Sequence, residues 1–375
     1  MSDDLAWRPR ARASRRAFLR SAAIGASGLV GAYLLGCGEE EVAQVGPAPT
    51  FTAPTGLPIR GTALPSRLQW RQRVTSGAEP PARRDHSLVS DGERLVLFGG
   101  RGPNPLGDTW VYAIASNLWE QPLGDPAPPA RFGHSAVWDL ASNRIILFGG
   151  QAEGGTFFND LWAFDPETWQ WSQLDTGSGP SPRYGAGGAY DPAGRMLITH
   201  GFTDTGRFDD TWTLDLASGT WSDISPTGED EDRPIERCLM RAVWDPRQER
   251  LFIFGGQTTD TPFLGDLWSY APSRWRALER DPRPSPRNLY AMAFDEEAFH
   301  IILFGGNTSA GPVNDVWFYD AGSERWGQLP QQDEGPSARY GHDGVWLPER
   351  RSFVIFGGND GGENLNDLWQ LTPAS

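Results

Sequence analysis

The segment PARFGHSAVWDLASNRIILFGGQAEGGTFFNDLW, residues 129 to 162, contains the features that decide the fold of this protein. An apolar run rich in β-branched residues, Ile145 to Phe148, ends in the glycine pair Gly149-Gly150. Such a run, bounded by glycine, is typical of a buried β-strand. Asp160 and Trp162 come about ten residues after the glycine pair and begin a second apolar run. Because glycine supplies backbone freedom and lets strands approach closely, the segment predicts two paired strands of one sheet.

This pattern recurs along the rest of the chain. The run with its glycine pair returns, once in the degenerate form MLITHG, at Leu95 to Gly100, Ile145 to Gly150, Met196 to Gly201, Leu251 to Gly256, Ile301 to Gly306 and Phe353 to Gly358. The aspartate and tryptophan that come after it are Asp108/Trp110, Asp160/Trp162, Asp210/Trp212, Asp266/Trp268, Asp315/Trp317 and Asp367/Trp369. These tryptophans are 52, 50, 56, 49 and 52 residues apart. A repeat of about 50 residues built from short strands predicts the blades of a propeller.

A second tryptophan in each repeat predicts how the ring closes. It opens a last strand at Trp119, Trp171, Trp221, Trp275 and Trp326. The sixth copy is missing after Trp369 and is present at the other end of the chain as Trp70. We therefore expect residues 68 to 74 to form the outermost strand of the last blade, which leaves no sheet edge unpaired at the junction. The two positions use twelve of the 17 tryptophans, whose large rings are expected to pack between blades.

The combination of Pro129-x-Arg131-x-Gly133-His134-Ser135, Arg144-Ile-Ile-Leu-Phe-Gly-Gly150, Asn159-Asp160-Leu161-Trp162 and Trp171 resembles the Kelch family in six copies over about 300 residues. The resemblance implies an all-β fold, a six-bladed Kelch-type β-propeller over residues 68–375. It says little about activity, because one fold hosts many functions.

Composition excludes several classes of function. All 33 basic residues are arginine, so catalysis by a lysine nucleophile or Schiff base is excluded. The formal net charge is −15; residues 1–36 carry six Arg and two Asp, so the rest has 27 Arg against 46 acidic residues, a net charge of −19. Such a surface repels nucleic acid, and we expect no nucleic-acid partner and a monomer.

The N-terminal segment is expected to be an export address. Arg15 and Arg16 lie in a motif that resembles the twin-arginine signal. The apolar run Ala22 to Leu35 that follows is shorter than a typical transmembrane helix. Cys37 ends a sequence that resembles a bacterial lipoprotein box. We therefore expect a signal peptide in residues 1–36, a lipidated Cys37 with a flexible tether in residues 37–67, and a protein exported to the bacterial cell envelope, on its periplasmic face or the cell surface. Membrane contact would be through the lipid anchor only.

One arginine occurs in every repeat and has two interpretations. The six copies are Arg83, Arg131, Arg183, Arg237, Arg287 and Arg339. A residue that all blades share usually serves blade geometry, and each guanidinium would then be clamped by a carboxylate such as the aspartate before tryptophan. The Kelch resemblance implies a second possibility, in which these arginines lie at the channel mouth and bind anions.

Positions that break the repeat are better functional candidates. Arg241 and Asp343 replace the small residues found at the start of the other innermost strands, and they either face the channel or pair with each other. His86, His134 and His342 share one position and could ligate zinc or copper, although the family repeat often has histidine there. His200, the free cysteine Cys238 and the acidic loop residues 229 to 232, with calcium binding as an alternative, complete the set.

The function expected from these observations is protein or acidic-glycan binding, or scaffolding, by a cell-envelope lipoprotein. No catalytic residue, metal or cofactor is assigned. The alternative is a carbohydrate-active enzyme of the sialic acid mutarotase type, which resembles other exported Kelch proteins and needs only a general acid and base beside an anionic sugar.

Overall fold

The computed structural model describes residues 68–122, 124, 126–227, 233–271, 274–278, 280–332 and 334–373. Regular structure in these ranges is almost entirely β, apart from two three-residue 3-10 helices at Glu153–Gly155 and Pro348–Arg350. Within these ranges no helix has the length and apolarity needed to cross a lipid bilayer.

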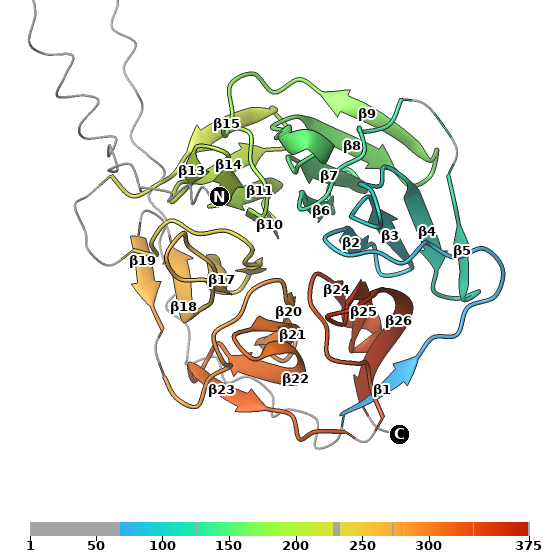
Figure 1. The fold of residues 1–375 in the computed structure, drawn as a ribbon. Helices are drawn as coiled ribbons and strands as arrows, with labels where there is room; N and C mark the ends of the chain where they lie inside the picture. The colour runs from blue at the N-terminus through green and yellow to red at the C-terminus, as the bar shows by residue number, and fades with distance from the viewer. Residues whose placement is uncertain are drawn as a thin grey trace, which may run out of the picture. The chain divides into compact units, whose positions relative to one another are not determined.

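Six four-stranded antiparallel sheets stand around a central axis as the blades of a propeller (Figure 1). Blades one and two comprise β2 (Ser87–Ser90), β3 (Arg94–Phe98), β4 (Thr109–Ala113) and β5 (Leu118–Glu120), then β6 (Ser135–Asp139), β7 (Arg144–Phe148), β8 (Leu161–Asp165) and β9 (Gln170–Leu174). Blade three comprises β10 (Gly187–Asp191), β11 (Arg195–Thr199), β14 (Thr211–Asp215) and β15 (Thr220–Asp223), with a small hairpin of β12 (Phe202–Thr203) and β13 (Gly206–Arg207). Blades four and five comprise β16 (Ala242–Asp245), β17 (Arg250–Gly256), β18 (Leu264–Ala271) and β19 (Arg274–Ala277), then β20 (Ala291–Asp295), β21 (His300–Thr308), β22 (Gly311–Asp320) and β23 (Arg325–Gln328).

The two ends of the described chain meet in blade six, which comprises β24 (Asp343–Leu347), β25 (Ser352–Asn359), β26 (Asn364–Pro373) and β1 (Leu68–Gln72). Strand β1 pairs antiparallel with β26, with Trp70 opposite Leu371 (Figure 1). The predicted closure of the ring by an N-terminal outermost strand is therefore confirmed.

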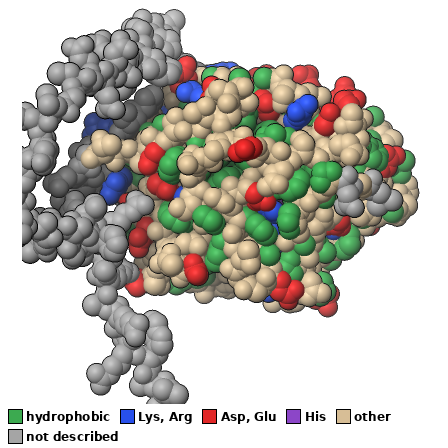
Figure 2. Space-filling view, turned by 90° about the horizontal axis from the view of Figure 1, so that it is seen from above, with side chains coloured by type: hydrophobic (Ala, Val, Ile, Leu, Met, Phe, Trp, Pro, Cys, Tyr) green, Lys and Arg blue, Asp and Glu red, His purple; other side chains and the backbone are tan. Residues whose placement is uncertain are grey.

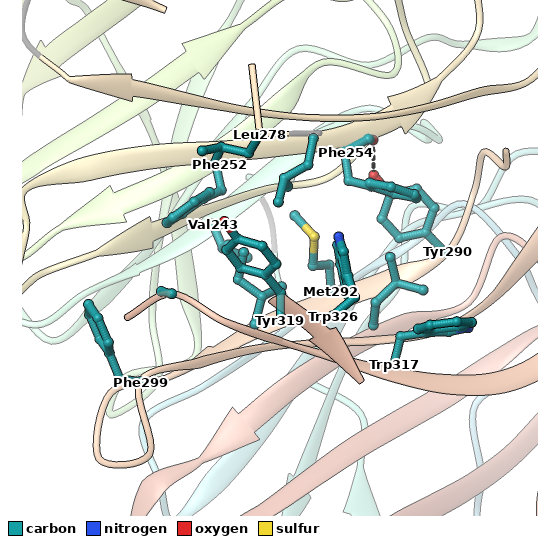
Figure 3. Close-up of a cluster of buried hydrophobic side chains, with 14 residues drawn as sticks. Val243, Phe252, Phe254, Leu278, Tyr290, Met292, Phe299, Trp317, Tyr319 and Trp326 are labelled. Carbon is teal, nitrogen blue, oxygen red and sulfur yellow. Dashed lines mark hydrogen bonds between the residues drawn. The ribbon is translucent and has the colours of Figure 1, made fainter. Parts of the chain in front are cut away.

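The hydrophobic core lies between neighbouring blades. The second tryptophan of a blade packs edge-on against a phenylalanine of the preceding blade, with ring centroids 4.9 to 5.5 Å apart, in the pairs Trp70–Phe304, Trp119–Phe356, Trp171–Phe98, Trp221–Phe148 and Trp326–Phe254. Figure 3 shows the interface of blades four and five, where the Tyr290 hydroxyl donates to the Phe254 carbonyl. Such aromatic packing buries large apolar rings between the blades.

The boundary between blades three and four departs from this pattern. Blade three has Thr199 and His200 where the other blades have phenylalanine and glycine. The buried His200 ring packs edge-on against Trp275 at 5.8 Å, so it replaces the missing phenylalanine ring. His200 holds a left-handed backbone with φ of 58°, and its Nδ1 lies 2.7 Å from the Thr199 hydroxyl. His200 is thus a packing residue.

A view perpendicular to Figure 1 shows acidic side chains scattered among apolar and neutral ones, with few arginines (Figure 2). The charge on that visible side of the propeller is dispersed rather than concentrated in one patch.

Candidate functional site

The six repeated arginines form clamps inside the blades. Arg131 donates from Nη1 and Nη2 to the two carboxylate oxygens of Asp160 at 2.6 and 2.8 Å, and to the backbone carbonyls of Pro129 and Gly149. The Trp162 indole donates to the same carboxylate at 2.7 Å. The arrangement recurs in all blades, in the pairs Arg83–Asp108, Arg131–Asp160, Arg183–Asp210, Arg237–Asp266, Arg287–Asp315 and Arg339–Asp367.

Each of these arginines is at most 1% exposed. Burial alone would raise the pKa of Asp108, but the Arg83 guanidinium and the Trp110 indole lower it below its usual value. The interpretation of the six arginines as an anion site at the channel mouth is therefore corrected: their donors are used by their own blades, and they are not available to a ligand.

The residues two positions after the clamp arginines join the six blades to one another. These six residues, which we name the central ring, are Asp85, Gly133, Gly185, Leu239, Leu289 and Gly341. Each N–H donates to the carbonyl of the ring residue in the preceding blade, at 2.7 to 3.1 Å, so the bonds close a circle through all six blades. All six have φ between 55° and 68°, a conformation that favours glycine.

An isolated β-bridge in each blade directly precedes the central-ring residue of that blade in sequence. The residue just before each ring residue forms a β-bridge with the residue just after a glycine pair; the twelve residues of this bridge ring are Arg84, Arg101, Phe132, Gln151, Tyr184, Phe202, Cys238, Gln257, Asn288, Asn307, Tyr340 and Asn359. The bridge ring carries two arginines and no carboxylate. We refer to the central ring and the bridge ring together as the mouth of the propeller.

Arg241 lies beside the mouth and is paired. Its Nη2 lies 3.1 Å from Oδ1 of Asp343, and the Arg241 side chain is 28% exposed. Asp343 also accepts the backbone N–H of Leu88 through Oδ2 at 2.9 Å. Burial raises the pKa of Asp343, and the Arg241 charge opposes that rise. The two exceptional residues therefore pair with each other across blades four and six, as one of the two sequence interpretations expected.

Asp85 is the one acidic residue of the central ring. Its side chain is 9% exposed, and Oδ2 lies 3.6 Å from Nε of Arg84. Its Oδ1 is buried without a hydrogen-bond partner. Burial raises the pKa of Asp85 to about 6, against the opposing charges of Arg84, Arg241 and Arg101. A carboxylate that is only loosely held thus lies among the arginines of the mouth.

A groove of about 300 Å³ opens beside the mouth, over blades one to three. It is lined by Arg101, Pro103, Pro105, Phe132, Gln151, Ala152, Glu153, Gly154, Gly155 and Tyr184. The Arg101 guanidinium carbon lies 5.1 Å from the centroid of the Phe132 ring, and Tyr184 packs edge-on against that ring at 5.5 Å. The Tyr184 ring also covers Gly133, where a Cβ would lie 2.0 Å from a ring carbon. Tyr184 therefore borders both the groove and the central ring.

The comparisons with known proteins agree with this architecture. Residues 63–232 and 229–375 match the KLHDC2/KLHL20/DRC7 Kelch-repeats domain. The chain belongs to the Kelch-repeat domain family. It is 28% identical over 330 residues to Adagio-like protein 3 of Oryza sativa subsp. japonica, covering 82% of this chain and 51% of that protein. It is 27% identical to the leucine-zipper-like transcriptional regulator 1 homolog of Drosophila melanogaster, covering 80% of this chain and 32% of that protein. This Kelch chain thus spans about half or less of the length of these relatives.

The three histidines of the Kelch repeat pack between blades. His86, His134 and His342 each lie edge-on to a phenylalanine of the preceding blade, at 5.2 to 5.5 Å. Burial lowers the pKa of His134 to about 3, so its imidazole is neutral at neutral pH. In the part of the chain that the structure describes, no three histidine, cysteine, aspartate or glutamate side chains gather as a metal site would require.

Of the remaining candidates from the sequence, the structure describes only Cys238. Cys238 is buried in the bridge ring, and burial raises the pKa of its thiol, which makes it a poor nucleophile. Arg15, Arg16, Cys37 and the acidic residues 229 to 232 lie outside the described residues.

Sequence reasoning missed Arg84, Arg101, Asp85 and Tyr184. The signal used for Arg241 was available only for Asp85, which stands where three other blades have glycine; the positions of Arg84, Arg101 and Tyr184 differ from blade to blade. Without the central ring in view, nothing marked those positions as facing one surface.

Proposed function

We propose that this Kelch propeller is a protein-binding module whose mouth holds an extended segment of a partner protein that carries carboxylates. The observation that carries the proposal is the division of the arginines into two groups. The six repeated arginines donate to carboxylates inside their own blades. By contrast, Arg84 and Arg101 belong to the bridge ring, which has no carboxylate, and Arg241 lies beside the mouth.

Charge supports this choice of ligand. The chain as a whole has a formal net charge of −15, so arginines gathered at one mouth form a local exception that would orient an acidic segment. The guanidinium of Arg101 has no carboxylate partner among the described residues and stacks on Phe132. A guanidinium held flat in this way presents its donors in the geometry that a carboxylate accepts.

The proposal also covers where in the cell this module is located. We propose that a twin-arginine signal exports the chain and that a lipid on Cys37 holds it in the bacterial cell envelope, with residues 37–67 as a tether. The motifs around Arg15, Arg16 and Cys37 support this placement.

Binding of a fluorescein-labelled glutamate-rich hexapeptide to the full chain tests the proposal, measured by fluorescence anisotropy. We expect binding that weakens as salt concentration rises, and a loss of about tenfold in affinity for Arg84→Gln and for the double variant Arg241→Gln/Asp343→Asn, since each loses one charge-assisted contact. The double variant removes both charges of the pair and so avoids stranding Asp343.

Arg144→Gln is the matched control, because Arg144 is exposed at the start of β7, the end of that strand opposite to the mouth. Equal binding of a glutamine-rich hexapeptide would overturn the proposal. Binding of an acidic oligosaccharide such as polygalacturonate, with no binding of the peptide, would assign the mouth to a glycan instead.

A further inference from the structure

The side chains that line the groove beside the mouth indicate what kind of group the groove would bind. Its walls include Pro103, Pro105, Phe132 and Tyr184, and its charged lining residues are Arg101 and Glu153. Because one positive and one negative side chain line it, the groove has no clear preference for a second carboxylate. A neutral group with a large apolar surface suits it better.

The volume of the groove and the stacking of Arg101 on Phe132 limit the kind of group that the groove can bind. A hollow of about 300 Å³ lies at the lower end of the range of ligand pockets and has room for one large side chain. Arg101 is exposed, and its one ring contact within the described residues is with Phe132. The other face of the guanidinium is therefore open to a second aromatic ring, which arginine favours through cation–π attraction and stacking.

We propose that the groove is a specificity pocket that takes an aromatic side chain of the partner segment, stacked on the open face of Arg101. This inference rests on the proposed function, because it concerns the same bound segment. Tyr184 borders both the groove and the central ring, so a segment whose carboxylate lies at the mouth can place a neighbouring ring in the groove. The preferred ligand then combines a carboxylate with an adjacent phenylalanine, tyrosine or tryptophan.

Two labelled hexapeptides that differ only in tyrosine or alanine beside the glutamates test this with the full chain. The tyrosine peptide should bind about 5- to 10-fold more tightly, which is the range expected of one cation–π and stacking contact. Ala152→Phe should fill the groove and remove this preference, while its affinity for the alanine peptide stays unchanged. Arg101→Ala should lower the affinity for the tyrosine peptide more than for the alanine peptide, and Arg144→Ala should change neither.

The outcomes separate the two proposals. If both peptides bind the wild-type chain equally, and Ala152→Phe changes neither affinity, the groove proposal is wrong and the mouth proposal stands. If neither peptide binds, both proposals are wrong. If the tyrosine peptide is preferred and the preference survives Ala152→Phe, the aromatic ring binds outside the groove and the groove proposal is again wrong.

Discussion

Arg131 connects four acceptors inside blade two: both carboxylate oxygens of Asp160 and the carbonyls of Pro129 and Gly149. We expect Arg131→Ala to lower the free energy of unfolding by about 2 to 5 kcal/mol, because it leaves the Asp160 carboxylate mostly buried without its counter-charge. Urea unfolding measures this. Arg101→Ala, which removes an exposed arginine without a carboxylate partner, should change it by less than about 1 kcal/mol. Similar small losses for both variants would contradict the role of the clamp.

Asp85 should make stability depend on pH. Its pKa is about 6 in the folded chain against an ordinary value of 3.8, so the folded state binds this proton more tightly than the unfolded state. The free energy of unfolding therefore falls as pH rises from about 4 to about 6. Above that range it stays lower by the full cost of the buried Asp85 charge.

Asp85→Asn removes this cost while keeping a residue that tolerates the left-handed backbone at φ of 56°. We expect the variant to be more stable than the wild type at pH 7, by up to about 3 kcal/mol, and equal to it near pH 4. Melting temperatures at the two pH values measure the effect. The exposed exchange Glu93→Gln is the control, and a gain of the same size at both pH values would refute this account of Asp85.

The internal repeat explains which residue roles could be predicted from the sequence. Arg131 and Asp160 recur in every copy, so their pairing could be expected from the sequence, and Arg241 and Asp343 stood out against small residues. Asp85 and Tyr184 could not be interpreted in the same way, because their importance comes from the circle of backbone hydrogen bonds, which no single repeat contains.

At the scale of single elements, β1 matters most for stability, because it is the outermost strand of blade six and closes the ring. Its outer edge is covered by Gln332, whose Oε1 accepts the Trp70 N–H at 3.0 Å and whose Nε2 donates to the Leu68 carbonyl. One amide side chain thus satisfies both a donor and an acceptor that the strand would otherwise leave unpaired.

Gln332→Ala should therefore destabilise the fold by about 1 to 2 kcal/mol, since two hydrogen bonds to the strand are lost. The exposed neighbour Gln331, changed to alanine, is the control and should have no effect beyond a few tenths of a kcal/mol. Thermal unfolding distinguishes the two variants. Identical melting temperatures would mean that β1 is held by β26 alone.

Most elements can be expected from the apolar runs, but their lengths cannot. In blades four to six the second strand continues through the glycine pair, as in β21, which extends to Thr308, whereas β3 and β7 end at the preceding phenylalanine. A shift of register between Phe304 and Gly306 allows the continuation. The partners that pair beyond the glycines come from loops whose sequences differ between blades, so the repeat could not predict these lengths.

For the molecule as a whole, the ring could be predicted because six similar units with a displaced tryptophan have one way to close. The ligand could not, because the mouth is formed by residues of all six blades and its chemistry depends on which blades are neighbours.

The proposed lipid anchor gives a prediction for the molecule as a whole. Cys37→Ser should move the chain from the membrane fraction to the soluble fraction of the envelope, because the sulfur that would carry the lipid is absent. Detergent partitioning and cell fractionation measure this. Cys238→Ser is the matched control, since that thiol is buried in the propeller and should leave the distribution unchanged. Membrane association of Cys37→Ser at the wild-type level would refute lipidation.

Closure through β1 also sets an order of events during synthesis. The strand from Leu68 to Gln72 leaves the ribosome long before its partner, β26, whose residues 364 to 373 are near the end of the chain. Five blades can assemble while translation proceeds, but the sixth is incomplete until β26 has been synthesised, and until then β1 lacks its partner strand. The pairing of that one strand therefore reports whether all six blades have been synthesised, and a product truncated before β26 would expose the unpaired edge of β1.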